Sequence, residues 1–457
     1  MRAQGVLFLC CLFLVSALAG SGQSAWAEPV PAAPSPSVLP SIPTVATPQG
    51  DSIRAREYWL SDYGFDQLWK QATGKGVTVA VIDTGVDKNH QDLKNNVLAG
   101  WDASGVGDAK GWQGLGLEPE HGTLAASVIA GHGHDDGQTA DQGQPGKPAG
   151  MLGIAPQAKI LPISLEMGTV TAGSKDIEQQ IPEAVECAVN KGADIINLSV
   201  GSNKPTWPKS WDKAFAYAQE RGVLVVASAG NRSSGLIQVG APATIPGVLS
   251  VGGVDRSRKD SWSSSSQGIS IAVTAPAEYL VGAVPGNDYA MWSGTSAAAP
   301  IVSGLAALIK EAYPELSANQ IIERIISSAD DRGPAGRDAI YGYGIINPQR
   351  AMAADTADDT ETNPLGSVSE WIKVHRENQS QAGQPVEQAA EQEPVPAEEV
   401  SASQASGTDG DAELAGPISA QSGQQTGWLA PVIIGLFALW VVIITARAVI
   451  RLKKISR

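Results

Sequence analysis

Apolar residues along this chain gather in short, nearly continuous runs of strand length, separated by longer segments in which they recur at helical spacing. The runs lie at 77–82, 159–165, 194–199, 222–231 and 248–254. The segments of helical spacing lie at 121–130, 177–191, 211–221 and 316–329. A strand that is apolar on both sides is typical of a parallel sheet covered by helices on both faces. The alternation therefore predicts an α/β fold with a doubly wound, mostly parallel sheet.

A different pattern stands at Trp292–Pro300, which has the sequence W-S-G-T-S-A-A-A-P and leads into the apolar run 297–309. It places Ser296 in the first turn of a helix, where free backbone N–H groups and the helix dipole stabilise negative charge. Gly294 would let a substrate backbone approach, and Pro300 would either kink the helix or lie in its first turn. The tripeptide G-T-S alone is more typical of an ordinary helix cap, so other residues must decide.

Three further polar residues stand at the ends of predicted strands or at the starts of predicted helices, namely Asp83, His121 and Asn231. A serine hydroxyl becomes a good nucleophile when a base takes its proton, and His121 is a base of suitable pKa. Asp83 would fix the imidazole tautomer and stabilise the imidazolium. The Asn231 side-chain amide and the Ser296 N–H would hold the oxyanion of a tetrahedral intermediate. The four residues together predict acyl transfer.

The chain resembles the subtilisin-like (S8) serine proteases over about residues 50–350. The segments that carry the resemblance are V-I-D-T-G-V-D (81–87), H-G-T-L-A-A-S-V-I-A (121–130), N-L-S-V-G (197–201), S-A-G-N (228–231) and G-T-S-A-A-A-P (294–300). The resemblance implies a serine endopeptidase that acts on a protein or peptide substrate. It makes Asp83, His121 and Ser296 the triad and Asn231 the oxyanion donor, in the chain order known for subtilisin.

The same resemblance implies where the substrate backbone would bind. Ser199, Val200 and Gly201 would form an edge that pairs with the substrate as an added strand, and Gly230 would lie beside it. Arg232 follows the oxyanion asparagine, so it would either rim the pocket for the residue before the cleaved bond or be an ordinary solvated arginine. No cofactor is implied.

A narrower resemblance is to the mycosins, which are membrane-anchored subtilases associated with type VII secretion systems. The shared features are a signal peptide, a short N-terminal extension, Gly-rich insertions, an acidic Pro-rich linker and one C-terminal transmembrane helix. Two features depart from this pattern: mycosins usually carry disulfides, whereas this chain has one cysteine, Cys187, outside the leader, and the residue before the histidine, often Gly in subtilases, is here Glu120. Two functions follow: an endopeptidase that cleaves secreted proteins, or a structural subunit that stabilises a secretion pore, with proteolysis secondary.

Both ends of the chain predict export and membrane attachment. Residues 1–27 have the charge, apolar core and A-x-A ending of a signal peptide, and a Pro-rich extension follows at 28–50. Residues 428–446 are apolar over about a bilayer's width, and the basic tail 447–457 follows them. The positive-inside rule then places the C-terminus in the cytoplasm and the catalytic domain, 51–354, outside.

The segment 355–427 between the catalytic domain and the predicted transmembrane helix has the composition of an acidic, disordered linker. It holds 14 Asp or Glu against two basic residues, which accounts for most of the net charge of −15. The rest of the chain is thus only mildly acidic, and nothing predicts a nucleic-acid partner. An amphipathic piece, Val368–Val374, interrupts the linker and is expected to be a transient helix.

Cysteine and metal chemistry add little to the picture. Cys187 is the one cysteine left after removal of the signal peptide, so no internal disulfide is expected. His132, His134, Asp135 and Asp136 lie in the polar insertion 131–150. They are either metal ligands or, as is more usual for such a composition, part of a Gly-rich surface loop, and we name no metal site.

Overall fold

The computed structural model describes residues 51–141, 143–355 and 362–377. All of these described residues belong to one compact unit. The predicted signal peptide, Pro-rich extension, transmembrane helix and basic tail lie outside the described residues, as does most of the predicted linker. Among the helices of the described ranges, none is long and apolar enough to cross a membrane.

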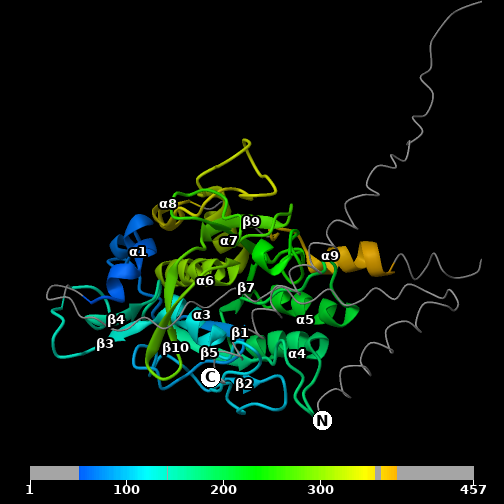
Figure 1. The fold of residues 1–457 in the computed structure, drawn as a ribbon. Helices are drawn as coiled ribbons and strands as arrows, with labels where there is room; N and C mark the ends of the chain where they lie inside the picture. Colours follow the sequence, from blue (N-terminus) through cyan, green and yellow to red (C-terminus); the bar gives the residue numbers. More distant parts are fainter. Residues whose placement is uncertain (1–50, 142, 356–361, 378–457) are drawn as a thin grey trace, which may run out of the picture. The chain divides into compact units, whose positions relative to one another are not determined.

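A parallel sheet of seven strands forms the centre of the fold (Figure 1), in the order β2-β5-β1-β6-β7-β8-β9. Its strands are β1 (Thr78–Asp83), β2 (Trp101–Asp102), β5 (Lys159–Ser164), β6 (Ile195–Leu198), β7 (Leu224–Ser228), β8 (Leu249–Val254) and β9 (Ile271–Pro276). Neighbouring strands run parallel throughout. Strands are added on both sides of β1, and the predicted doubly wound, mostly parallel arrangement is confirmed.

Strand β1 shows why the run 77–82 is apolar throughout. The side chains of Val79 and Val81 pack into one core, while those of Ala80 and Ile82 pack into another, and all four are fully buried. Successive side chains of a strand point to opposite faces, so both faces of the sheet are covered.

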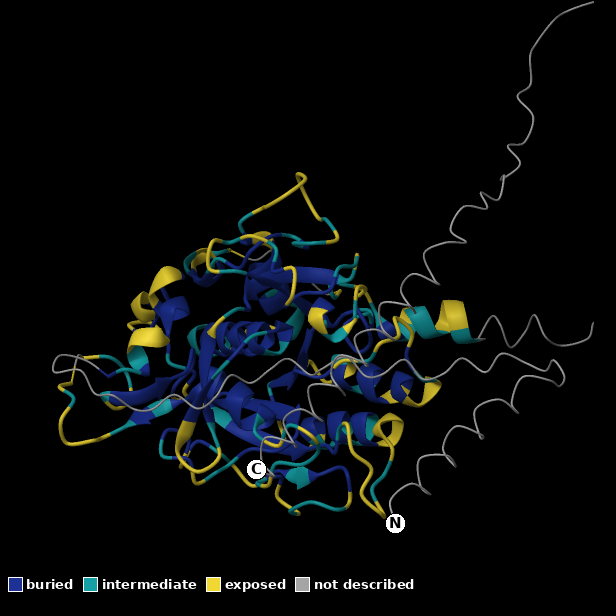
Figure 2. Cartoon of the chain, viewed as in Figure 1, coloured by how far each residue is buried: buried dark blue, intermediate teal, exposed yellow. Residues whose placement is uncertain are grey.

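Helices cover both faces. One core holds residues of α3 (His121–Ala130), α6 (Thr295–Ala312), α7 (Ala318–Ser327) and α8 (Pro348–Ala353), and the other holds residues of α4 (Ile177–Asn190) and α5 (Lys209–Glu220). Figure 2 shows the sheet and α6 as buried, with the exposed residues on loops and on outer helix ends. The four predicted helices are confirmed, with boundaries within two residues of the expected ones.

Two antiparallel hairpins were not predicted from the sequence. The ends of the polar insertion pair as β3 (His132–His134) and β4 (Ala149–Leu152), so 131–150 is a hairpin with an exposed tip. The second hairpin, β10 (Leu280–Val284) and β11 (Asp288–Trp292), leads directly into α6. Both hairpins are assembled from segments whose alternation of apolar and polar residues is short or broken by glycine.

The first described residues cover one end of the core. The short helices η1 (Arg54–Arg56), α1 (Tyr58–Asp62) and α2 (Phe65–Leu68) stand where one helix and a turn were expected. Gly64, with a φ of +70°, separates α1 from α2 because it adopts the left-handed conformation. Within α1, the Trp59 side chain is fully buried and joins the core.

The segment 362–377 corrects the expectation of a transient helix in the linker. Helix α9 (Val368–Ile372) and the π-helical segment η3 (Lys373–Glu377) pack against the domain beside α5 (Figure 1). The Val368 side chain is fully buried, and the Val368 N–H donates to Gln219 Oε1 over 3.0 Å. The packed domain therefore includes residues beyond the predicted limit at 354, because the apolar face of this amphipathic piece packs against the core on the side of α5.

Candidate active site

The carboxyl ends of three neighbouring strands supply residues to one edge of the sheet. Asp83 is the last residue of β1, the segment 199–201 follows β6, and Asn231 lies three residues after β7. Helices α3 and α6 begin at this edge with His121 and Ser296 in their first turns. A cleft of about 260 Å³ opens there, and its lining includes His121, Ser199, Val200, Gly201, Gly230, Asn231 and Ser296.

Asp83 and His121 form a buried pair at the base of the cleft. The His121 Nδ1 lies 2.8 Å from Asp83 Oδ1 and 3.0 Å from Oδ2. The carboxylate is fully buried and the His121 side chain is 10% exposed. An ionised carboxylate only accepts hydrogen bonds, so Nδ1 carries the proton and Nε2 of the neutral ring is the free base.

The pKa of His121 is raised above its ordinary value of 6.5. Burial opposes the charged imidazolium, but the charge of Asp83 and its hydrogen bond outweigh burial, with smaller contributions from Glu118 and Glu120. The protonated imidazolium of His121 is thus stabilised, as is required of a residue that takes a proton as general base.

The start of α3 is tied to the end of β1 by small residues. The Gly122 N–H donates to Thr84 Oγ1 over 3.0 Å. A Cβ on Gly122 would lie 2.2 Å from the carbonyl oxygen of Gly85, so no larger residue fits after His121. The close approach explains why a glycine follows the histidine.

Trp292, the last residue of β11, also fixes the imidazole. Its indole meets the His121 ring edge-on, with ring centroids 5.6 Å apart and an interplanar angle of 88°. The indole is 4% exposed. The sequence pattern contained Trp292 but gave no reason to assign it a role, because only the tertiary fold brings β11 beside α3.

Asn231 is oriented by Thr295, which sequence reasoning also passed over. The Thr295 N–H and Oγ1–H donate to Asn231 Oδ1 over 2.8 and 3.1 Å. The backbone N–H is a donor only, so Oδ1 faces Thr295 and the Nδ2 amide is left as a donor for the cleft. Gly294 has a φ of +139°, and a Cβ there would lie 3.0 Å from Asn231 Nδ2. This glycine makes room for the asparagine, a reason other than the expected approach of substrate.

Ser296 makes two reciprocal hydrogen bonds with Ser199. The Ser296 hydroxyl donates to the Ser199 carbonyl over 3.1 Å, and the Ser199 hydroxyl donates to the Ser296 carbonyl over 2.9 Å. The second bond exists because Pro300, four residues after Ser296, has no N–H to donate to the Ser296 carbonyl. In this conformation the serine hydroxyl is thus hydrogen-bonded to Ser199 and not to His121.

The predicted substrate edge lines the cleft but is not uniformly open. Ser199 is 3% exposed and Val200 7% exposed, whereas Gly201 faces open space, with no atom within 4 Å of a Cβ built on it. Gly230, with a φ of +99°, accepts from Ser266 N–H over 2.7 Å and donates its own N–H to Thr295 Oγ1 over 3.0 Å. The structure gives Ser199 a contact with Ser296 that the sequence did not predict.

Arg232 fits neither of the two alternatives that the sequence left open. It is 9% exposed, and NH2 donates to Asp260 Oδ1 and Oδ2 over 2.6 and 2.7 Å. Its guanidinium lies 4.4 Å from the centre of the Trp262 ring. Its Nε donates to the Trp262 carbonyl over 2.8 Å, so Arg232 is neither solvated nor free to rim the pocket.

The candidate metal ligands of the insertion do not converge. His132 contacts the carbonyl oxygens of Gly133 and Lys94, His134 pairs with Asp92 at 2.6 Å, and Asp136 closes a local turn with Thr139. No group of three or more His, Cys, Asp or Glu suited to a metal occurs in the described part of the chain. Each of these side chains already has a protein partner.

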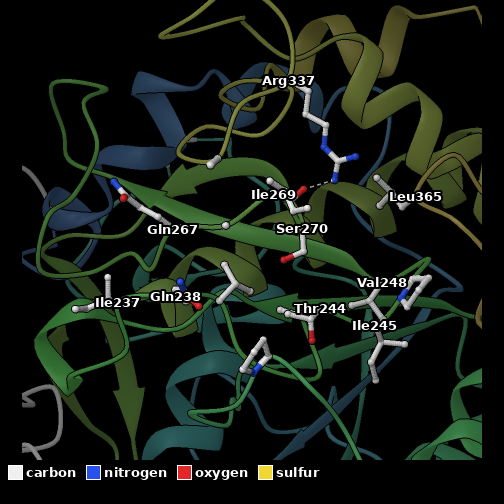
Figure 3. A pocket seen from close by; sticks show the side chains of 16 residues that line it. Ile237, Gln238, Thr244, Ile245, Val248, Gln267, Ile269, Ser270, Arg337 and Leu365 are labelled. Atoms are coloured by element: carbon white, nitrogen blue, oxygen red, sulfur yellow. Dashed lines mark hydrogen bonds between the residues drawn. The ribbon is translucent and has the colours of Figure 1, made fainter. Parts of the chain in front are cut away.

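A larger pocket, of about 770 Å³, lies elsewhere in the domain (Figure 3). It is lined mainly by apolar side chains such as Ile237 and Ile269, and Arg337 at its edge donates to the Ile269 carbonyl over 2.7 Å. None of the predicted site residues lines it. It holds no nucleophile beside a base, so the smaller cleft is the candidate active site.

Comparison with known sequences matches the part of the chain that contains the candidate active site. The sequence model of the Subtilase family matches residues 74–344, which include the cleft and Asp83. Fervidolysin of Fervidobacterium pennivorans is 31% identical over 353 residues, 68% of this chain and 48% of fervidolysin. Subtilisin DY of Bacillus licheniformis is 36% identical over 283 residues, 61% of this chain and 91% of subtilisin DY. The chain thus matches about half of fervidolysin but nearly all of subtilisin DY.

Two solved structures are similar to the fold described here. The crystal structure of fervidolysin, described as a keratinolytic enzyme related to subtilisin, matches with a TM-score of 0.55 and 27% identity over 71% of this chain and 51% of that one. MycP1, with its N-terminal propeptide removed, matches with a TM-score of 0.52 and 29% identity over 66% of this chain and 99% of that one.

Proposed function

This chain belongs to the subtilase family of serine endopeptidases, and we propose that it is a membrane-anchored member that cleaves secreted proteins outside the cell. The observation that carries the catalytic part is the cleft that joins His121, paired to Asp83, with Ser296 and an oriented Asn231. Similarity to MycP1 supports the narrower assignment to a mycosin-like protease linked to type VII secretion.

Catalysis would begin with a rotation of the Ser296 side chain away from the Ser199 carbonyl towards His121 Nε2. His121 then takes the hydroxyl proton as Oγ attacks the substrate carbonyl, and Asp83 stabilises the imidazolium. Negative charge develops on the substrate oxygen. It is stabilised by hydrogen bonds from Asn231 Nδ2 and from the Ser296 N–H, which is one of the free donors at the start of α6. The imidazolium returns its proton to the leaving amine, and water completes the cycle through the same base.

Membrane attachment rests on the sequence of the C-terminal segment, 428–446 with the basic residues 447–457. Because 362–377 packs on the domain, the tether would begin at residue 378 and span about 50 residues. A flexible chain of that length has a root-mean-square span of roughly 40 Å. Cleavage would therefore be confined to substrates that emerge close to the membrane.

The alternative, a structural subunit at a secretion pore, is tested with Ser296→Ala in the native host. The proposal predicts that a cleaved secreted protein accumulates uncleaved in the variant, while the variant is present at wild-type levels. Secretion that continues in the variant and fails in a deletion strain would show both roles. Unchanged cleavage in the variant would contradict the proposed protease.

Replacing Asn231 with alanine is expected to lower kcat by about 10²- to 10³-fold with little change in KM, as for the oxyanion asparagine of subtilisin. The lost Nδ2 donor acts on charge that is present only in the transition state. Steady-state kinetics on a peptide substrate measures both constants. Asn190→Ala, on the surface of α4, is the matched control, and a loss expressed mainly in KM would contradict the role.

The pH profile follows from the raised pKa of His121. Only the neutral imidazole can accept the Ser296 proton, so kcat/KM is expected to fall as the pH drops through a pKa above 6.5. The profile of kcat/KM reports the pKa of the free enzyme. An acid limb centred below 6.5 would show that Asp83 does not stabilise the charged ring.

A further inference from the structure

A second pocket, of about 480 Å³, continues from the candidate active-site cleft. Met167, Val200 and Gly201 line both hollows, so a peptide lying along 199–201 would pass from one to the other. The walls of this second pocket are mostly apolar and include two indoles, Trp207 and Trp211. Successive side chains of an extended peptide point to opposite sides, and such a pocket suits one bulky apolar side chain.

The wall residue Trp207 is fixed by three contacts. Its Nε1–H donates to Asp212 Oδ1 over 2.7 Å, its carbonyl accepts from Arg376 NH2 over 3.1 Å, and its ring packs on Trp371 with centroids 4.3 Å apart. Two of the three contacts come from the segment 367–377. That segment lies outside the family match, which ends at residue 344.

Arg376 contacts both Asp212 of α5 and Trp371 of α9. Its Nε donates to Asp212 Oδ2 over 3.0 Å, in an ion pair whose side chains are 25% and 9% exposed. Its guanidinium also lies 5.0 Å from the centre of the Trp371 ring. The same Asp212 therefore binds the wall tryptophan and the arginine that holds its backbone.

The segment itself is anchored independently of Trp207. Val368 is fully buried and bonded to Gln219, and the Leu365 carbonyl accepts from Gly247 N–H over 3.0 Å. Substitutions at Trp371 or Arg376 therefore change how Trp207 is held while the anchors of α9 stay in place.

We propose that the segment 367–377 is a positioning element for substrate selection, in which Trp371 and Arg376 hold Trp207 as the wall of a pocket for a bulky apolar side chain on the substrate. This inference rests on the proposed protease function. It adds that residues outside the family match, 74–344, determine which substrate side chain is preferred. Neither residue touches the substrate in this arrangement, so both act through Trp207.

The test uses the full-length protein in detergent and peptides in which Phe and Ala are exchanged at each of four positions before the cleaved bond. Wild type is expected to prefer Phe at one position, and Trp371→Ala to reduce that preference in kcat/KM about tenfold, mainly through KM. Trp371→Phe is expected to restore most of it. Val374→Ala, on the exposed side of the same segment, is the matched control.

Labelling of Ser296 by a small fluorophosphonate separates this inference from the function on which it rests. The labelling rate and melting temperature of Trp371→Ala are expected to stay near wild type. An unchanged Phe preference in Trp371→Ala, or equal loss for all peptides, would overturn the inference. Wild type that neither cleaves nor takes the label would overturn the protease function, and the inference with it.

Discussion

Replacing Ser296 or His121 with alanine is expected to lower kcat on the order of 10⁶-fold, and replacing both is expected to lower it no further. The reason is that the hydroxyl and the base act as one unit, so the loss of either removes the whole proton-transfer path. Effects of this size and this lack of additivity are known for subtilisin. Single and double variants compared on one peptide substrate provide the measurement.

The residual rate of these variants carries further information. The oxyanion donors remain in both, so a rate of about 10³-fold over water should persist. Folding is checked by thermal melting followed by far-ultraviolet circular dichroism, because the Trp292 indole packs on His121 and its near-ultraviolet signal would change once that ring is removed. Losses that multiply in the double variant would show that the two residues act independently and would contradict the triad.

Replacing Asp83 with asparagine is expected to lower kcat about 10⁴-fold at neutral pH. The carboxylate accepts the proton on His121 Nδ1 at 2.8 Å, whereas an amide nitrogen placed there would donate one. The ring would then carry its proton on Nε2 and could no longer accept from Ser296. The acid limb of the pH profile should also move down, because the charge that raises the pKa of His121 is gone.

Asp194→Asn is the matched control for this variant. Asp194 accepts from the Thr78 N–H at the opposite end of β1, so its replacement tests the strand without touching the cleft. Activity is expected to stay at the wild-type level. A loss of activity of equal size in both variants would trace the effect to the sheet, and would contradict a specific role for Asp83.

The parallel sheet could be predicted from the sequence because its strands are buried on both faces. Val79 to Ile82 have no polar interruption, and Asp83 marks the point where the strand leaves the core. That sharp change from apolar to polar also located the edge where the site lies. The hairpin and the short β2 carry no comparable signal. Strand β10 is apolar but short and interrupted by Gly282, β11 mixes buried and exposed residues, and β2 has only two residues.

The side chains that the sequence predicts to react lie together at one cleft, but the residues that support them were not predicted. Trp292 and Thr295 lie within the quoted pattern, yet their contacts with His121 and Asn231 join segments far apart along the chain. The amphipathic piece around Trp371 was placed in the linker because charge dominates its surroundings. Only the fold supplies the core that its apolar face covers.

Arg232 illustrates the opposite difficulty. Its place after Asn231 suggested a pocket rim or a solvated side chain, and the structure instead buries it against Asp260, 28 residues further on. An ion pair between distant segments leaves no periodic trace in a sequence. Position beside a functional residue was therefore a poor guide to the direction of the side chain.

The central claim is that Ser296 is the nucleophile of an acyl-transfer site built by His121, Asp83 and Asn231. The most direct measurement is mass spectrometry of the protein after reaction with a fluorophosphonate, with the modified peptide sequenced. The account predicts one adduct per chain, on Ser296, that is lost in His121→Ala. Absence of the adduct from folded wild type, or an adduct on another serine, would contradict it.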